Sequence, residues 1–208
     1  MLAAAAAASI PVRPGSPDEL DALAEDHQGV VAILASVPES RGALGERDLA
    51  NFAFKADAIV VVLDGITDPQ NLGAAARSAE AAGATMLVSR IRRSAEVTPA
   101  AVRASAGALL HLPHARVANI PRAIERLQDL GFFVVGLDGE AHSTVFDDAC
   151  PPGRVAIVVG SEGTGLSRLA KERCDTLRRL PMMGRVASLN ASAALAATLY
   201  AYVMPSRG

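Results

Sequence analysis

Hydrophobic residues from position 58 onward form short continuous runs, separated by turn residues and by segments with helical periodicity. The clearest runs are AIVVVL at 58–63, FFVVGL at 132–137 and VAIVV at 155–159. Runs that do not alternate with polar residues are typical of strands buried on both faces, which occur mainly in parallel sheets. The pattern therefore predicts an α/β fold, with a mostly parallel sheet and helices on both of its faces.

The other expected elements follow from the same pattern and from the glycines and prolines that stop it. We expect further strands at 85–88, 109–117 (interrupted by Pro113) and 176–180. We expect helices at 72–82, 99–106, 120–130, 166–172 and 191–203.

Residues 1–50 have a different character, with prolines at 11, 14 and 17, an acidic patch at 18–21 and one short apolar run at 29–34. The run at 29–34 predicts one short strand, and the segment is too small to form its own core. We therefore expect an N-terminal extension or linker over 1–50 and one compact domain over 51–208. The alanine-rich start lacks the positive charge of a signal peptide, and no stretch approaches the ~20 apolar residues of a membrane helix.

The net charge of −2 over 208 residues gives no global attraction to nucleic acid. Local clusters of cations remain open to two interpretations, a contact with phosphates or a solvated face. These clusters are Arg90, Arg92 and Arg93; Arg168, Lys171 and Arg173; and Arg178 and Arg179. The two cysteines have no metal-type or redox-type spacing, which makes a reducing cytoplasm the expected location. The four histidines share no spacing, so we expect no metal site and no histidine-based triad.

Three loops that follow predicted strands carry polar residues, and ligands of open α/β sheets bind at the carboxyl ends of strands. In the first loop, Asn71 is a candidate N-cap, and Gly73 would leave backbone N–H groups open to a ligand. Arg77 lies six residues after Asn71, about 9 Å along a helix axis, and could reach the mouth of the loop. A capped helix with a solvated arginine explains the same spacing.

The second loop, GSEGTG at 160–165, follows a buried strand but has neither of the glycine motifs that bind nucleotide phosphates. Glu162 would repel a phosphate, so the loop suits a cofactor without phosphates, and a plain glycine-rich turn is the alternative. Neither Ser161 nor Ser188 has an identifiable base, which disfavours hydrolase chemistry.

The third loop precedes the last predicted helix. Leu180 and Leu189 could hold a flat apolar group between them, and Gly184 and Ser188 could free or supply polar contacts. Asn190 could cap the helix at 191–203. From this stretch alone, a capped buried helix is the simpler interpretation.

Taken together and in order, the three loops resemble the three motifs of the SpoU (TrmH-type, SPOUT) RNA 2′-O-methyltransferases. The matching stretches are NLGAAAR at 71–77, VVGSEGTGLS at 158–167 and LPMMGRVASLNAS at 180–192. The similarity covers about residues 52–203. HQGVVA at 27–32 also resembles the join after a small RNA-binding domain in the subgroup that methylates guanosine ribose in large-subunit ribosomal RNA. Only 26 residues precede it, so we expect most of that domain to be missing.

The resemblance implies an α/β-knot, in which the C-terminal segment threads a loop to form a trefoil. It implies S-adenosylmethionine as the cofactor, with adenosine-binding positions at Gly160, Leu180, Met182 and Leu189. It implies Arg77 as the main catalytic residue, with four residues shaping the pocket: Asn71, Glu162, Ser188 and Asn190. A guanidinium group, with a pKa above ~12, is a poor proton acceptor. We therefore expect Arg77 to stabilise the developing alkoxide rather than to act as a base.

The resemblance further implies a homodimer with the active site close to the subunit interface. The alanine-rich helix at 191–203 fits close packing there and fits interior packing equally well. The expected function is methylation of a guanosine ribose 2′-OH in 23S ribosomal RNA. The alternatives are a transfer-RNA ribose methyltransferase, a resistance methyltransferase acting on ribosomal adenosine, and an inactive RNA-binding or assembly protein.

Overall fold

The structure is a computed structural model that describes residues 2–24, 27, 29–33, 44–147 and 150–203. Contacts along the chain divide it into two compact units, Met1–Val37 and Pro38–Gly208. In the part of the chain that is described, no helix has the length and apolar character needed to cross a membrane.

The first unit contains two short helices, α1 (Leu2–Ala7) in the alanine run and α2 (Pro17–Asp21). Ser16 and Glu19 form a capping box at the start of α2, in which each side chain accepts from the other residue's backbone N–H. The strand predicted at 29–34 is wrong over residues 29–33, which form no strand, and residue 34 lies outside the described residues. An apolar run becomes a strand only where another strand can pair with its backbone.

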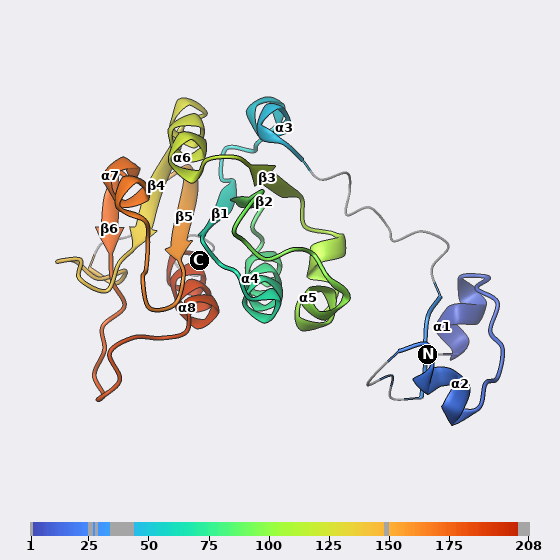
Figure 1. Cartoon of the computed structure of the whole chain (residues 1–208). Coiled ribbons are helices and arrows are strands. Elements are labelled where there is room, and N and C mark those ends of the chain that lie inside the picture. Colours follow the sequence, from blue (N-terminus) through green and yellow to red (C-terminus); the bar gives the residue numbers. More distant parts are fainter. Residues whose placement is uncertain (1, 25–26, 28, 34–43, 148–149, 204–208) are drawn as a thin grey trace. The chain divides into compact units, whose positions relative to one another are not determined.

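The second unit is built on one six-stranded sheet with the order β3-β2-β1-β5-β4-β6 (Figure 1). The strands are β1 (Ile59–Asp64), β2 (Met86–Arg90), β3 (His114–Val117), β4 (Phe132–Leu137), β5 (Arg154–Gly160) and β6 (Thr176–Arg178). Every pair of neighbouring strands is parallel, which confirms the predicted α/β class with a parallel sheet. The carboxyl ends of the strands therefore meet at one edge, where Asp64 at the end of β1 pairs with Gly160 at the end of β5.

Helices cover both faces of the sheet (Figure 1). One face packs against α4 (Pro69–Ala81), α5 (Pro99–Ala104), the short 3₁₀ helix η1 (Ala108–Leu110) and α8 (Ala191–Val203). The other face packs against α3 (Glu46–Asn51), α6 (Ile120–Asp129) and α7 (Arg168–Arg173). Leu49 of α3 is buried there, and Leu44 forms a β-bridge with Ala115. Residues 44–50, which lie in the predicted extension, thus pack with the second unit.

Two predicted element boundaries differ from the observed ones by three residues or more. The strand expected at 109–117 exists only after Pro113, because the residues before it form η1 and a turn. Helix α4 begins at Pro69 instead of residue 72, and Asp68 is its N-cap, with Oδ1 accepting from the Gln70 N–H at 3.0 Å. Asn71 is therefore not a cap, which leaves its side chain free for another contact. The pair Asp68-Pro69 is itself a strong helix start, since proline fits the first helical position.

The prediction that Gly73 opens backbone N–H groups to a ligand is also wrong. Gly73 is buried inside α4, where an added Cβ would lie 2.5 Å from both the Ala101 carbonyl oxygen and the Ala104 Cβ. The glycine instead allows α4 and α5 to approach closely. The knot implied by the resemblance stays a prediction.

Candidate functional site

Three side chains from three distant loops form one hydrogen-bonded cluster at the carboxyl edge of the sheet. Asn71, in the first turn of α4, donates from Nδ2 to Glu162 Oε1 at 3.0 Å. Asn190, just before α8, donates from Nδ2 to Asn71 Oδ1 at 2.9 Å and also to Glu162 Oε1. The structure thus brings together one polar residue from each of the three stretches singled out in the sequence.

Asn190 serves two purposes at once. Its Oδ1 accepts from the backbone N–H groups of Ser192 at 2.9 Å and Ala193 at 3.3 Å, which is the predicted N-cap of α8. Its Nδ2 supplies the hydrogen bonds to Asn71 and Glu162. The start of α8 is therefore fixed to the same cluster that gathers the other two loops.

The glycine-rich loop between β5 and α7 has a tightly folded backbone. Ser161 and Gly165 form a β-bridge, and the Ser161 and Thr164 hydroxyls lie 2.6 Å apart. Gly160 has no room for a side chain, since a Cβ would lie 2.0 Å from the Gly165 carbonyl carbon. The loop ends at Ser167, whose backbone N–H donates to Oδ2 of the buried Asp64 at 2.8 Å. The end of β1 thus anchors the end of this loop.

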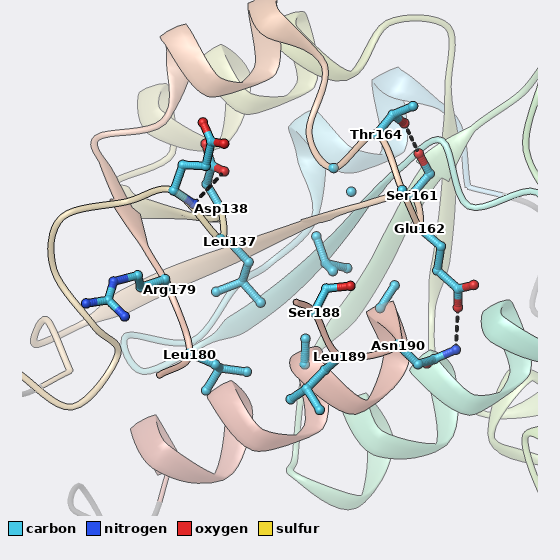
Figure 2. Close-up of a pocket in the computed structure, with 18 of the residues that line it drawn as sticks. Leu137, Asp138, Ser161, Glu162, Thr164, Arg179, Leu180, Ser188, Leu189 and Asn190 are labelled. Carbon is cyan, nitrogen blue, oxygen red and sulfur yellow. Dashed lines mark hydrogen bonds between the residues drawn. The ribbon is translucent and has the colours of Figure 1, made fainter. Parts of the chain in front are cut away.

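A cavity of about 600 Å³ lies beside this loop, between the ends of β4 and β5 and the segment that leads into α8 (Figure 2). The four predicted cofactor-binding residues all line it: Gly160, Leu180, Met182 and Leu189. Glu162, Ser188 and Asn190 line it as well, so the hydrogen-bonded cluster stands at its wall. Asn71 reaches the cavity only through its hydrogen bonds to Glu162 and Asn190.

Arg77 stands apart from these residues. It lies on the exposed side of α4, is not among the residues that line the cavity, and forms no ion pair or side-chain hydrogen bond with the described residues. The structure therefore does not join Arg77 to the cluster, and its catalytic role stays a prediction. Its guanidinium is open to a ligand that approaches from solvent.

An ion pair that the sequence pattern did not predict stands at the cavity wall. Asp138, directly after β4, accepts from Lys171 Nζ of α7 at 2.7 Å, and both residues line the cavity. Burial raises the pKa of Asp138, but hydrogen bonds from the Lys171 ammonium and the Glu140 N–H, with the charge of Lys171, outweigh it and lower the pKa. The rule that ligands gather where strands end could have found Asp138, because it follows the run at 132–137.

No histidine or cysteine is among the described residues that line the cavity. No group of three or more histidine, cysteine or acidic side chains in the described part of the chain is arranged to hold a metal ion. The Ser161 hydroxyl lies 2.6 Å from the Thr164 hydroxyl and has no hydrogen bond to a histidine or a carboxylate among the described residues. Of the histidines, His114 is buried with Nε2 2.8 Å from the Ser89 hydroxyl and is not among the residues that line the cavity.

The lining fits S-adenosylmethionine, which is cationic and has no phosphates. Leu137, Leu180 and Leu189 give the cavity an apolar part suited to a flat base, as the side chains in Figure 2 show. The carboxylates of Glu140 and Glu162 supply acceptors for hydroxyl or ammonium groups. The cavity volume lies within the range of about 300–1,000 Å³ typical of small-molecule sites.

Comparison with known proteins gives relatives along most of the chain. A 23S rRNA (guanosine-2'-O-)-methyltransferase RlmB of Pseudomonas putida is 40% identical over 201 residues, which is 96% of this chain and 80% of the relative. The protein of the same name from Coxiella burnetii is 42% identical over 188 residues, 89% of this chain and 73% of the relative.

Solved structures agree. The SpoU methyltransferase AviRb from Streptomyces viridochromogenes, in complex with the cofactor AdoMet, matches with a TM-score of 0.70 and 32% identity, covering 76% of this chain and 64% of that one. An AdoMet-bound rRNA methyltransferase from Sinorhizobium meliloti matches with a TM-score of 0.70 and 26% identity, covering 77% and 60%. The model of the SpoU rRNA Methylase family matches residues 58–200, which include all three loops. This chain belongs to the SpoU rRNA methylase family.

Proposed function

We propose that this protein transfers the methyl group of S-adenosylmethionine to a ribose 2′-hydroxyl of RNA, and that its target is a guanosine in 23S ribosomal RNA. The single observation that carries the proposal is the cluster of Asn71, Glu162 and Asn190 at the wall of a cavity that suits this cofactor. The target base is inferred from the relatives named as 23S rRNA (guanosine-2'-O-)-methyltransferases, which are about 40% identical to this chain.

The cofactor supplies a methyl group on a positively charged sulfur. In the transfer, the bond from the ribose 2′-oxygen to the methyl carbon forms, the sulfur–methyl bond breaks, and the sulfur becomes a neutral thioether. The hydroxyl proton leaves to solvent or to an RNA phosphate. The protein's part is to align the reacting oxygen and to stabilise the negative charge that develops on it.

Glu162 is placed for alignment. Its Oε1 already accepts from Asn71 and Asn190, which fixes the direction of the carboxylate and leaves Oε2 without a hydrogen bond from the described residues. That oxygen can accept from a ribose hydroxyl at the cavity mouth, while Ser188 offers a hydroxyl on the same lining.

Arg77 would approach the developing alkoxide when RNA covers the exposed side of α4. Replacing Arg77 with lysine keeps the charge but loses the planar fork of donors. We expect Arg77→Lys to lower kcat by on the order of 10²-fold, the effect of losing one well-placed donor. Near-normal turnover with only a shifted pH profile would show that the planar fork has no role.

We also propose that the protein works as a homodimer in the cytoplasm, where ribosomal RNA is found, and that its fold carries the family's knot. Support for the dimer comes from apolar side chains that remain exposed in the segment before α8 and on α8 itself: Met183 is 94% exposed, Val186 67% and Tyr200 46%. Burying such residues against a second copy would be favourable. A monomer by light scattering at micromolar concentration would contradict the dimer.

The test of the function uses the purified protein, S-adenosylmethionine and an unmodified 23S ribosomal RNA transcript. We expect calorimetry to show binding of the cofactor, and mass spectrometry of nuclease fragments to locate one new 2′-O-methylguanosine. Methylation of a bulk transfer RNA preparation and not of the 23S transcript would favour the transfer-RNA alternative, and a methyladenosine product the resistance enzyme. Absence of cofactor binding would favour the inactive RNA-binding protein.

A further inference from the structure

The loop that follows β2 carries a concentration of positive charge that the proposed chemistry does not use. Arg92 and Arg93 are exposed and follow the half-buried Arg90. Neither Arg92 nor Arg93 has a side-chain hydrogen bond or an ion pair with the described residues. The nearest acidic residue along the chain is Glu96. Two adjacent guanidinium groups thus face solvent without a partner, in a protein whose net charge is −2.

Arg116, in the neighbouring strand β3, holds this loop in shape. Arg116 of β3 donates from Nε to the Arg90 carbonyl oxygen at 3.0 Å and from a terminal nitrogen to the Ile91 carbonyl oxygen at 3.0 Å. The Ser94 hydroxyl also donates to the Arg90 carbonyl oxygen. The turn places Arg93 at a φ of 57°, a left-handed conformation that is uncommon for a side chain of this size. The loop is therefore fixed by its own contacts before any ligand binds.

The loop lies at the same edge of the sheet as the active-site cluster. β2 is parallel to β1, which is parallel to β5, so Arg90, Asp64 and Gly160 all stand at carboxyl ends. Two strand spacings separate the ends of β2 and β5, about 10 Å in all. The Ala95 N–H donates to the Ile66 carbonyl oxygen at 2.8 Å, which joins the arginine loop to the loop that leads into α4. This separation of the strand ends is about one Debye length, so the charge of the arginine loop is felt at the edge that carries the site.

We propose that Arg92 and Arg93 bind the phosphodiester backbone of the RNA beside the ribose that is methylated. This inference rests on the proposed function and adds the surface that holds the substrate. Guanidinium groups pair with phosphate oxygens through two parallel hydrogen bonds, and contacts of this kind position a nucleic acid without reading its sequence. A loop fixed in advance loses little conformational freedom when it binds, which favours a role in alignment.

The test compares three forms of the full chain by RNA binding at several salt concentrations. The double variant Arg92→Ala/Arg93→Ala removes both charges, and Arg92→Lys/Arg93→Lys keeps them. The matched control is Arg47→Ala/Arg122→Ala, which removes two exposed arginines from α3 and α6 on the helices that cover the other face of the sheet. The probe is the unmodified 23S ribosomal RNA transcript.

We expect the alanine variant to raise Kd for RNA about tenfold and to reduce the slope of log Kd against log salt by roughly 1.4–1.8, the loss of two phosphate contacts. The lysine variant should retain most of the slope, and the control all of it. Kd for S-adenosylmethionine should stay unchanged in all three, because neither arginine lines the cofactor cavity. An alanine variant with the wild-type Kd and slope would overturn the proposal, as would an equal loss in the control.

The two proposals fail in different ways. If the wild-type protein neither binds nor methylates the transcript, the proposed function is wrong and this inference falls with it. If the wild-type protein methylates RNA and the Arg92 and Arg93 variants bind it normally, only the RNA surface is wrong.

Discussion

Replacing Gly160 with alanine tests whether the shape of the glycine-rich loop creates the cofactor cavity. The added Cβ would lie 2.0 Å from the Gly165 carbonyl carbon, 2.2 Å from its oxygen and 2.3 Å from the Leu166 nitrogen. All three are backbone atoms, so no side chain can rotate away. Ordinary contact begins at 3.4 Å, and the loop must therefore move by about 1.4 Å, the difference between 3.4 Å and 2.0 Å.

A displacement of this size acts directly on the cavity, because residues 160–165 all line it. A misplacement of about 1 Å in a binding site costs on the order of 10²-fold in activity. Overpacking of this kind costs about 2 kcal/mol of stability, which corresponds to roughly 4–8 °C in Tm for a chain of this size. We therefore expect Gly160→Ala to lower activity about a hundredfold and to weaken cofactor binding while the protein still folds.

The assay is calorimetric titration with S-adenosylmethionine, together with a thermal melt. The control is Gly184→Ala in the segment before α8, because a Cβ there meets no atom within 4 Å and the residue's φ is not in the left-handed region. The control should bind the cofactor and melt as the wild type does. If Gly160→Ala bound the cofactor with the wild-type Kd, the cavity would not depend on the close approach of Gly160 to Gly165.

Three further predictions concern single side chains. Glu162→Gln should lower kcat by on the order of 10²-fold with little effect on the Tm, because Glu162 is exposed. The control Glu172→Gln, also at an exposed position, should leave kcat unchanged. If Glu162→Gln had the kcat of the wild type, Glu162 would have no role in catalysis. Asn190→Asp keeps the acceptor that caps α8 but faces Glu162 with a second carboxylate, so activity should fall while the Tm changes little. Asn190→Ala removes the cap as well, so it should lose both activity and about 1 kcal/mol of stability, measured by urea denaturation. Burial, with the charge of Arg116, lowers the pKa of His114 from 6.5 to about 4, so the unfolded chain binds a proton before the folded one as the pH falls through this window. The free energy of unfolding should therefore drop by about 2 kcal/mol between pH 7 and pH 5. His114→Gln should remove this drop in denaturation curves measured at both pH values.

The strands and most helices could be predicted because their signals are local. The run at 132–137 is β4 with the predicted bounds, and the helix at 191–203 is α8 with the predicted bounds. The wrong predictions have two different causes. Asn71 resembles a helix cap, but the stronger start Asp68-Pro69 precedes it. The reason for Gly73 is not local, because its neighbour α5 lies almost thirty residues further along the chain.

The membership of the site was harder to predict than the elements that carry it. Glu162 and Asn71 are 91 positions apart, and only the parallel sheet brings their loops together. The order of the three motifs nevertheless predicts that these residues belong to one site, because it resembles a family whose members place the three motifs in one pocket. That route could not find the pairing of Asp138 with Lys171, which depends on how α7 packs against the end of β4.

Asn190 shows how a helix cap and a binding-site residue can be distinguished once the contacts are known. Asparagine, aspartate and serine cap helices about equally well, so the cap of α8 alone does not explain why asparagine stands at this position. The hydrogen bonds of its Nδ2 do explain it, because an aspartate or a serine could not donate two of them while its oxygen holds the cap. An aspartate would also place a second negative charge against Glu162. The identity of residue 190 is therefore set by the site, and its position by the helix.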